Sequence, residues 1–356
     1  MSEALVIQYK KHVKSRLIFI LSIIILLLLV IVLSLVSGSV DISLKEIGKL
    51  ISGTGSAFNL QIILNIRLPR IVGGIMAGTA LAVSGAVIQS LLRNPLASPF
   101  TLGISGAAAF GAAFAVIVLG AGSSYTGSND VIHINLPALV TCSAFTWSLV
   151  SVFVILALSK YRGATPEIII LSGIIISSLF AAGISAMQYF ADSVQLASII
   201  FWTFGDLGRG MWRDSLILAI ILIPLLLYFY RQSWNYKSLQ SGDEHAKSLG
   251  VNVIRVRLSG MVAASLATAV VVSFFGIIAF VGLVVPHIIR RIIGNDEQFL
   301  VPASALFGGM FLLLSDTLAR TVIAPVILPV GILTSFMGAP LFLFLLVKGM
   351  GKSFWN

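Results

Sequence analysis

Residues 67–107 read RLPRIVGGIMAGTALAVSGAVIQSLLRNPLASPFTLGISGA, and this stretch is the most informative part of the chain for its fold. Arginines bracket it at 67, 70 and 93, whereas no charged side chain occurs from Ile71 to Leu92. An uncharged apolar segment of about 20 residues is what an α-helix needs to cross the hydrocarbon core of a membrane. Pro95 and Pro99 then stop the helix and hold the chain in a rigid, extended turn. The stretch therefore predicts a membrane helix followed by a polar turn.

Small residues recur every four positions along this predicted helix, at Gly74, Gly78, Ala82 and Ala86. Small side chains at that spacing let helix backbones approach closely in lipid, where packing holds helices together. The pattern predicts a tightly packed helical bundle and says nothing about a transported molecule.

The composition excludes a soluble protein. Hydrophobic residues make up 58% of the 356 positions and charged residues 10%, and the mean hydropathy is +1.05. The net charge of +10 could suggest nucleic-acid binding. The cations are instead spread between apolar segments, which favours a polytopic membrane protein that binds no nucleic acid.

Metal-binding and catalytic motifs are missing from the sequence. Cys142 is the only cysteine and lies in an apolar run, and the four histidines are scattered without ligand spacing. We expect no metal site, no cofactor and no catalytic residue. The segment Gly351-Lys352-Ser353 resembles the end of a phosphate-binding loop, but Leu346 stands where that loop needs its first glycine. The chain is therefore not expected to hydrolyse ATP.

Hydropathy predicts an all-α protein with ten membrane-spanning helices. Gly276 is the expected turn that divides one long apolar run into two short spans. The predicted spans are 17–36, 70–91, 101–120, 136–158, 167–190, 214–230, 257–275, 277–293, 299–317 and 329–347.

The charges predict the orientation in the membrane. Lys10, Lys11, Lys14 and Arg16 precede the first span and place the N-terminus in the cytoplasm. That span resembles a signal peptide, but its length favours a retained anchor. Ten spans return the C-terminus to the cytoplasm, so that cytoplasmic segments hold 16 of the 23 Lys and Arg residues. We expect a cytoplasmic segment at 1–16, a membrane domain at 17–347 and a cytoplasmic tail at 348–356.

Several motifs together resemble one transport family. They are the run Gly78–Gln89, the turn Arg93–Pro99, the segment Gly276–His287 with Arg290, and the late motifs Leu328–Gly331 and Gly338–Pro340. The chain resembles the FecCD-type permeases of ATP-driven importers for iron chelates, haem and cobalamin. The resemblance implies a dimer, of two copies or of one copy and a paralogue, around a central pathway. Two ATP-binding subunits and an extracytoplasmic solute-binding protein are the other implied partners, in the cytoplasmic (inner) membrane.

The resemblance implies a gate and a pathway lining. Asn94 and Leu96 in the double-proline turn match positions of the cytoplasmic gate, although the turn could also be only a helix stop. The span 167–190 matches the helix that lines the pathway. Serines there could equally bond to backbone carbonyls of their own helix. The candidate lining residues are Ser172, Ser177, Ser178, Ser185 and Gln188.

The segment 239–251 is the only sizeable cytoplasmic loop. Leu239, Ala246 and Leu249 would give a short amphipathic helix an apolar face that nothing in the chain obviously covers. In the family, the matching loop docks into the ATPase subunit; a solvated connector is the alternative. The candidate coupling residues are Leu239, Gly242, Asp243, Glu244, Ala246, Leu249 and Gly250.

Arginines near the predicted outer ends of helices have two interpretations. The resemblance implies that Arg67, Arg70 and Arg320 meet carboxylates of the solute-binding protein at an exposed rim. Asp316 and Arg320 are four residues apart, however, so a local ion pair is the simpler expectation for Arg320.

The sequence thus favours a permease that moves a metal chelate, with a ferric siderophore ranked first because such substrates dominate the family. Haem, cobalamin or an oxyanion are the alternatives. A stand-alone secondary transporter would need carboxylates in the middle of its spans, and the sequence offers none. A membrane-embedded enzyme would need clustered histidines or carboxylates, which are also missing.

Overall fold

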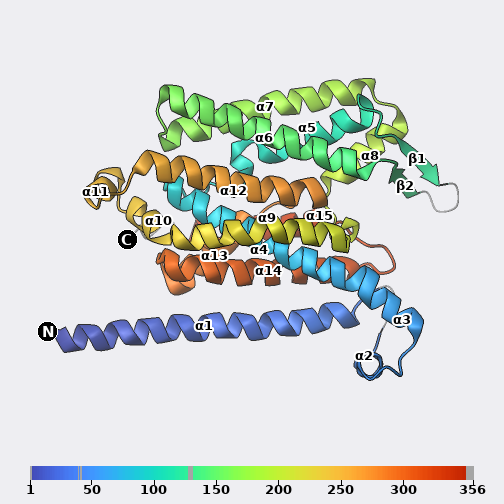
Figure 1. Cartoon of the computed structure of the whole chain (residues 1–356), viewed down its shortest axis with the longest axis horizontal. Helices are drawn as coiled ribbons and strands as arrows, with labels where there is room; N and C mark the ends of the chain where they lie inside the picture. The colour runs from blue at the N-terminus through green and yellow to red at the C-terminus, as the bar shows by residue number, and fades with distance from the viewer. Residues whose placement is uncertain (1, 39, 41, 127–130, 350–356) are drawn as a thin grey trace.

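The computed structural model describes residues 2–38, 40, 42–126 and 131–349, and within them the protein is a bundle of α-helices (Figure 1). The longer helices are α1 (Ser2–Val36), α4 (Leu68–Leu92), α6 (Pro137–Arg162), α7 (Pro166–Phe190), α9 (Trp212–Arg231), α12 (Val253–Phe275), α14 (Glu297–Thr321) and α15 (Val330–Gly349). The shorter helices are α2 (Leu44–Ile51), α3 (Ala57–Ile62), α5 (Ile104–Ile117), α8 (Ser193–Thr203), α10 (Ser233–Gln240), α11 (Asp243–Ser248) and α13 (Val281–Ile293). Single turns of other helix types are η1 (Ile63–Arg67), η2 (Pro99–Leu102) and η3 (Leu207–Arg209).

Helix α4 lies at the centre of the bundle and contacts α9, α12, α13 and α14. Its small residues allow this close contact. A Cβ atom added at Gly85 would lie 1.7 Å from the carbonyl oxygen of Gly282, and one added at Gly78 would lie 2.2 Å from that of Gly308. The close packing predicted for the helix over 70–91 is therefore confirmed.

The helix that contains α4 is longer than the predicted span 70–91. At its N-terminal end it continues through the π-helical turn η1 into α3, so the helical segment runs from Ala57 to Leu92. Single π turns of this kind occur mostly inside α-helices. The indole nitrogen of Trp212 donates to the carbonyl oxygen of Leu64 in this turn over 2.7 Å.

Every predicted span corresponds to a helix, but the count of ten crossings stays a prediction. Seven helical segments among the described residues are long and apolar enough to cross a membrane, while α5, α13 and the apolar part of α15 (Val330–Phe344) are shorter. Gly276 does separate α12 from α13, with φ of +77°. Helices α2, α3, α8, α10 and α11 lie outside all the predicted spans.

The predicted all-α fold class is confirmed, and one short hairpin interrupts the helices. Strands β1 (Ser123–Thr126) and β2 (Val131–Ile134) form an antiparallel hairpin between α5 and α6, in which Ser123 pairs with Ile134. The segment is short and polar at its start, so hydropathy alone offered no signal for it.

The two ends of the bundle differ in what they carry. The start of α1 lies at the same end as α10 and α11, and α2, α3 and the hairpin lie at the other end (Figure 1). Ion pairs link α1 and α10 at the first end. Asp296 accepts from Arg16 of α1 over 3.1 Å and lies 3.3 Å from Lys237 of α10. The predicted cytoplasmic elements 1–16 and 239–251 therefore share one end of the molecule.

Candidate functional site

The α10–α11 pair forms a short helical hairpin at this end, and the chain covers most of its apolar face. Leu239 and Ala246 are fully buried in the core that also contains Tyr236 and Leu91. The expectation that nothing covers these two residues is wrong, because the ends of α4 and α12 pack against them. Leu249 is different, since it is 61% exposed. One apolar residue of the expected face thus remains available to a partner.

Two glycines shape the hairpin. Gly242, between α10 and α11, has φ of +111°, and Gly250, after α11, has φ of +80°. Both values lie in the region that glycine adopts without strain. The turns therefore require glycine at positions 242 and 250, whatever else these residues contact.

The two acidic residues of α11 have different environments. Asp243 accepts a 2.8 Å hydrogen bond from the Nη2 of Arg257, which is almost fully buried. Glu244 is exposed and pairs with Lys247 at 2.9 Å. The hydrogen bond and charge of Glu244 raise the pKa of Lys247. Asp243 is thus tied to the protein interior, while Glu244 and Lys247 face solvent.

The predicted gate turn follows α4 at the same end. Arg93 has φ of +46°, and the Oδ1 of Asn94 accepts from the backbone N–H of Leu96 over 2.9 Å. This bond fixes the turn and presents Leu96, which is 48% exposed. The Nη1 of Arg93 lies 3.4 Å from where a Cβ of Gly242 would be. The gate turn and the α10–α11 hairpin are therefore neighbours.

Helix α7 carries the predicted pathway residues on more than one face. Ser178 and Ser185 lie on its exposed side, together with Leu171 and Leu179. Ser172 is buried, and Ser177 and Gln188 are half-buried.

The hydroxyls of three α7 serines donate to carbonyls of their own helix. Ser177, Ser178 and Ser185 each bond the residue four positions earlier, over 2.7, 3.1 and 3.1 Å. The structure thus puts only part of the predicted set on one exposed face, and it bears out the alternative that these hydroxyls bond the backbone.

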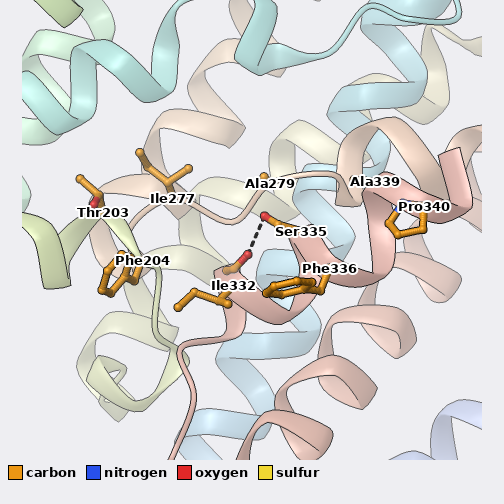
Figure 2. Close-up of a pocket in the computed structure, with 10 residues that line it drawn as sticks. Thr203, Phe204, Ile277, Ala279, Ile332, Ser335, Phe336, Ala339 and Pro340 are labelled. Atoms are coloured by element: carbon orange, nitrogen blue, oxygen red, sulfur yellow. Dashed lines mark hydrogen bonds between the residues drawn. The ribbon is translucent and has the colours of Figure 1, made fainter. Parts of the chain in front are cut away.

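A cavity of about 500 Å³ lies between α8, the 276–280 segment and α15 (Figure 2). Its polar side chains are the hydroxyls of Thr203 and Ser335, and each already donates to its own helix, over 2.7 and 2.8 Å. Figure 2 shows the Ser335 bond as a dashed line. The other lining residues are Phe204, Ile277, Ala279, Gly331, Ile332, Phe336, Ala339 and Pro340.

The cavity was not predicted from the sequence, although one signal for it was present. Gly331 belongs to the late motif Leu328–Gly331, and a Cβ there would lie 2.2 Å from the carbonyl oxygen of Phe204. The glycine allows α15 to approach the end of α8. The cavity wall is almost entirely apolar.

The three arginines expected at an exposed rim are buried. Arg67 is 4% exposed, Arg70 8% and Arg320 7%. Arg67 donates to the carbonyls of Leu35, Val36 and Val40. The expectation of exposure is wrong, because these guanidinium groups bond inside the chain.

Asp316 is the centre of this buried cluster. It is fully buried and accepts from Arg70, over 2.8 Å at Nη2, and from the Nε of Arg320 over 3.1 Å. Arg70 also lies 3.4 Å from Asp206, and Arg320 donates to Ser34 over 2.7 Å. The simpler expectation of an Asp316–Arg320 ion pair is therefore confirmed, and the docking role of the three arginines stays a prediction.

A second buried cluster at the other end of α14 was not anticipated. Glu297 is fully buried and lies 3.3 Å from Arg290, and its Oε1 also accepts from Gln240 of α10 over 2.6 Å. Ser90 of α4 bonds the same carboxylate. Arg290 and Glu297 lie near the predicted ends of spans. Charged residues at such positions are expected at the surface, so the sequence did not indicate this cluster.

Comparison with known proteins agrees with this architecture. The sequence model of the FecCD transport family matches residues 26–348. A Methanocaldococcus jannaschii protein classed as an ABC transporter permease is 52% identical over 341 residues, which are 96% of this chain and 97% of that protein. The hemin transport system permease of Yersinia pestis is 39% identical over 290 residues, which are 80% of this chain and 83% of that one.

A solved structure shares the fold over nearly the whole chain. It is an inward-facing conformation of a transporter assigned to the metal-chelate type of ABC transporters, with a TM-score of 0.81 and 29% identity. The match covers 92% of this chain and 98% of that one. The family model and these relatives match most of the chain, and the chain belongs to the FecCD transport family.

Proposed function

We propose that the chain is the permease subunit of an ABC importer that moves a metal chelate, with a ferric siderophore as the first candidate. The observation that carries this proposal is the α10–α11 hairpin, which presents exposed Leu249 beside the turn that holds Asn94 and Leu96. A partner that binds the hairpin could move the turn directly. An ATPase subunit is the partner that a permease of this family needs.

The proposed cargo follows from the side chains on the exposed face of α7 and in the cavity beside α15. The face of α7 with Ser178 and Ser185 and the cavity beside α15 present aliphatic side chains and already bonded hydroxyls. Such walls suit a bulky chelate that shields its own metal. The hemin permease of Yersinia pestis, whose name specifies an iron chelate, supports this class. Haem, cobalamin and an oxyanion remain the alternatives.

The proposed assembly has two permease copies, or this chain and a paralogue, with the exposed face of α7 toward the pathway. Two ATP-binding subunits would dock on the α10–α11 end, and a solute-binding protein on the opposite end. The ATPase subunits would hydrolyse ATP, and the permease would be the transport subunit. The end with α10 and α11 would be cytoplasmic, in accord with the cations at its surface.

A secondary transporter is the competing class. Such a protein harnesses an ion gradient through carboxylates accessible within its spans. The fully buried carboxylates of Asp316 and Glu297 lie near the two ends of α14, and each is paired with arginine. This arrangement favours a structural role for both groups.

Co-purification tests the proposal most simply. We expect the chain, expressed with the ATPase subunit of its own transport system, to form a stable complex that hydrolyses ATP. Uptake into vesicles should then compare a ferric siderophore, haem, cobalamin and an oxyanion. Uptake of one chelate that requires ATP supports the proposal. A chain that transports without the ATPase contradicts it.

A further inference from the structure

Arg257 connects three segments of the chain at the α10–α11 end. It lies in the first turns of α12 and is 2% exposed. Its Nη2 donates to Asp243 over 2.8 Å, its Nη1 to the carbonyl of Ala164 over 2.8 Å, and its Nε to the carbonyl of Leu91 over 3.1 Å. One buried side chain thus holds three separate parts of the sequence.

Each partner belongs to an element that the proposed function uses. Asp243 is the first residue of α11, the second helix of the hairpin expected to meet the ATPase. Leu91 lies in the last turn of α4, directly before the turn with Asn94 and Leu96. Ala164 lies in the short linker that leads from α6 into α7. Arg257 therefore contacts the α10–α11 hairpin, the end of α4 that leads into the gate turn, and the linker that leads into α7.

The chemistry of arginine suits this arrangement. Carbonyl groups in the last turn of a helix lack partners within the helix and carry the negative end of its dipole. The planar guanidinium group offers five N–H donors in a fixed geometry, so it can bond two carbonyls and a carboxylate together. A lysine at this position would supply a charge but could not hold the three acceptors in the same directions.

We propose that Arg257 is a positioning residue that fastens α11 to the end of α4 and to the α6–α7 linker. A displacement of the hairpin by the ATPase then moves the gate turn and the start of α7 as one rigid unit. The role rests on the proposed function, because it assigns the route by which the hairpin acts on the gate. Without Arg257, the hairpin moves and the gate does not follow.

The first test measures coupling in the assembled transporter. The wild-type chain, Arg257→Gln and Arg257→Lys are each reconstituted with the ATPase subunit and binding protein of the system. ATP hydrolysis and uptake of the ferric siderophore or hemin are measured in the same vesicles. Arg255→Gln is the matched control, because Arg255 is exposed and two residues away on the same helix.

We expect Arg257→Gln to assemble and to hydrolyse ATP, while uptake per ATP falls roughly tenfold or more. Arg257→Lys should recover part of the loss, and Arg255→Gln should match the wild type. Unchanged uptake per ATP in Arg257→Gln overturns the inference, provided that the wild type transports. Absence of transport by the wild type would instead contradict the proposed function.

A distance measurement gives a readout that a merely stabilising role would not move. Spin labels at Arg162 and Ser248, both exposed, report the α6–α7 linker and α11. They are introduced with Cys142→Ser, which removes the exposed native thiol. We expect the wild-type distance to stay the same when ATP binds, whereas in Arg257→Lys and Arg257→Gln it changes. A distance that stays fixed in both variants overturns the inference.

Discussion

Replacement of Asp316 by asparagine tests whether the buried cluster of arginines holds the bundle together. Asp316 is fully buried on α14 and accepts hydrogen bonds from Arg70 of α4 and from Arg320 of its own helix. Arg320 in turn donates to Ser34 of α1. The carboxylate therefore joins α1, α4 and α14 through two guanidinium groups. Asparagine keeps the size of the side chain and one oxygen acceptor but removes the negative charge.

The expected destabilisation follows from the partners that remain. Removal of one member of a buried ion pair typically costs about 3–5 kcal/mol, because the opposite charge stays buried without compensation. After Asp316→Asn, Arg70 still has Asp206 at 3.4 Å, and Arg320 still donates to Ser34 over 2.7 Å. We therefore expect a loss near the lower limit, about 3 kcal/mol in the free energy of unfolding.

Asp206→Asn is the matched control at the same cluster. Its side chain is 35% exposed, and it bonds the backbone N–H of Gly208, a bond that asparagine can keep. Loss of such a partly solvated ion pair should cost about 1 kcal/mol or less. Equilibrium unfolding in mixed micelles of dodecyl maltoside and sodium dodecyl sulfate, followed by circular dichroism, measures both variants. A loss for Asp316→Asn no larger than that for Asp206→Asn would refute the reasoning.

The same cluster changes how a docking experiment must be read. A glutamate at position 320 would bring a second carboxylate beside Asp316 and would remove the bond to Ser34. Reversal of Arg67, Arg70 and Arg320 should therefore destabilise the end of the bundle opposite α10 and α11. Slower binding of the solute-binding protein by such a variant would not, by itself, identify these residues as contacts.

Three further predictions concern other parts of the chain. Leu249→Asp should weaken ATPase binding and abolish uptake. The free energy of unfolding should stay unchanged, because Leu249 is 61% exposed. Normal assembly and uptake would show that the hairpin is only a connector. Leu96→Ala should leave assembly intact but increase cargo leak without ATP in vesicles, and an unchanged leak would remove this turn from the gate. Gly85→Ala should lower stability by about 1–3 kcal/mol through overpacking against Gly282, whereas Gly48→Ala, in open space, should be neutral or slightly stabilising in the same unfolding assay.

The sequence predicted the helices well because hydropathy and helix breakers act locally. The uncharged run 71–92 and the turn at Gly276 both appear in the structure close to where they were expected. The spacing of Gly74, Gly78, Ala82 and Ala86 indicated close packing, and the structure shows Gly308 against Gly78 and Ala82, and Gly282 against Gly85. Which helices meet at these glycines depends on long-range contacts that no local pattern specifies.

The functional residues were harder to predict because exposure depends on the whole bundle. Arg67, Arg70 and Arg320 match docking positions of the family, which implied a solvated rim, yet other segments of the chain enclose them. Leu239 and Leu249 have the same apolar character, but only Leu249 remains exposed after α4 and α12 pack against the hairpin. The three bonds of Arg257 come from segments as much as 166 residues apart, so no motif could have grouped them.

Reconstituted uptake tests the central claim most directly. The chain would be inserted into vesicles with the ATPase subunit and the binding protein of its system, and accumulation of a ferric siderophore or hemin would be followed. We expect accumulation only when ATP, the ATPase subunit and the binding protein are all present. Accumulation by the chain alone, driven by a proton or sodium gradient without ATP, would contradict the account.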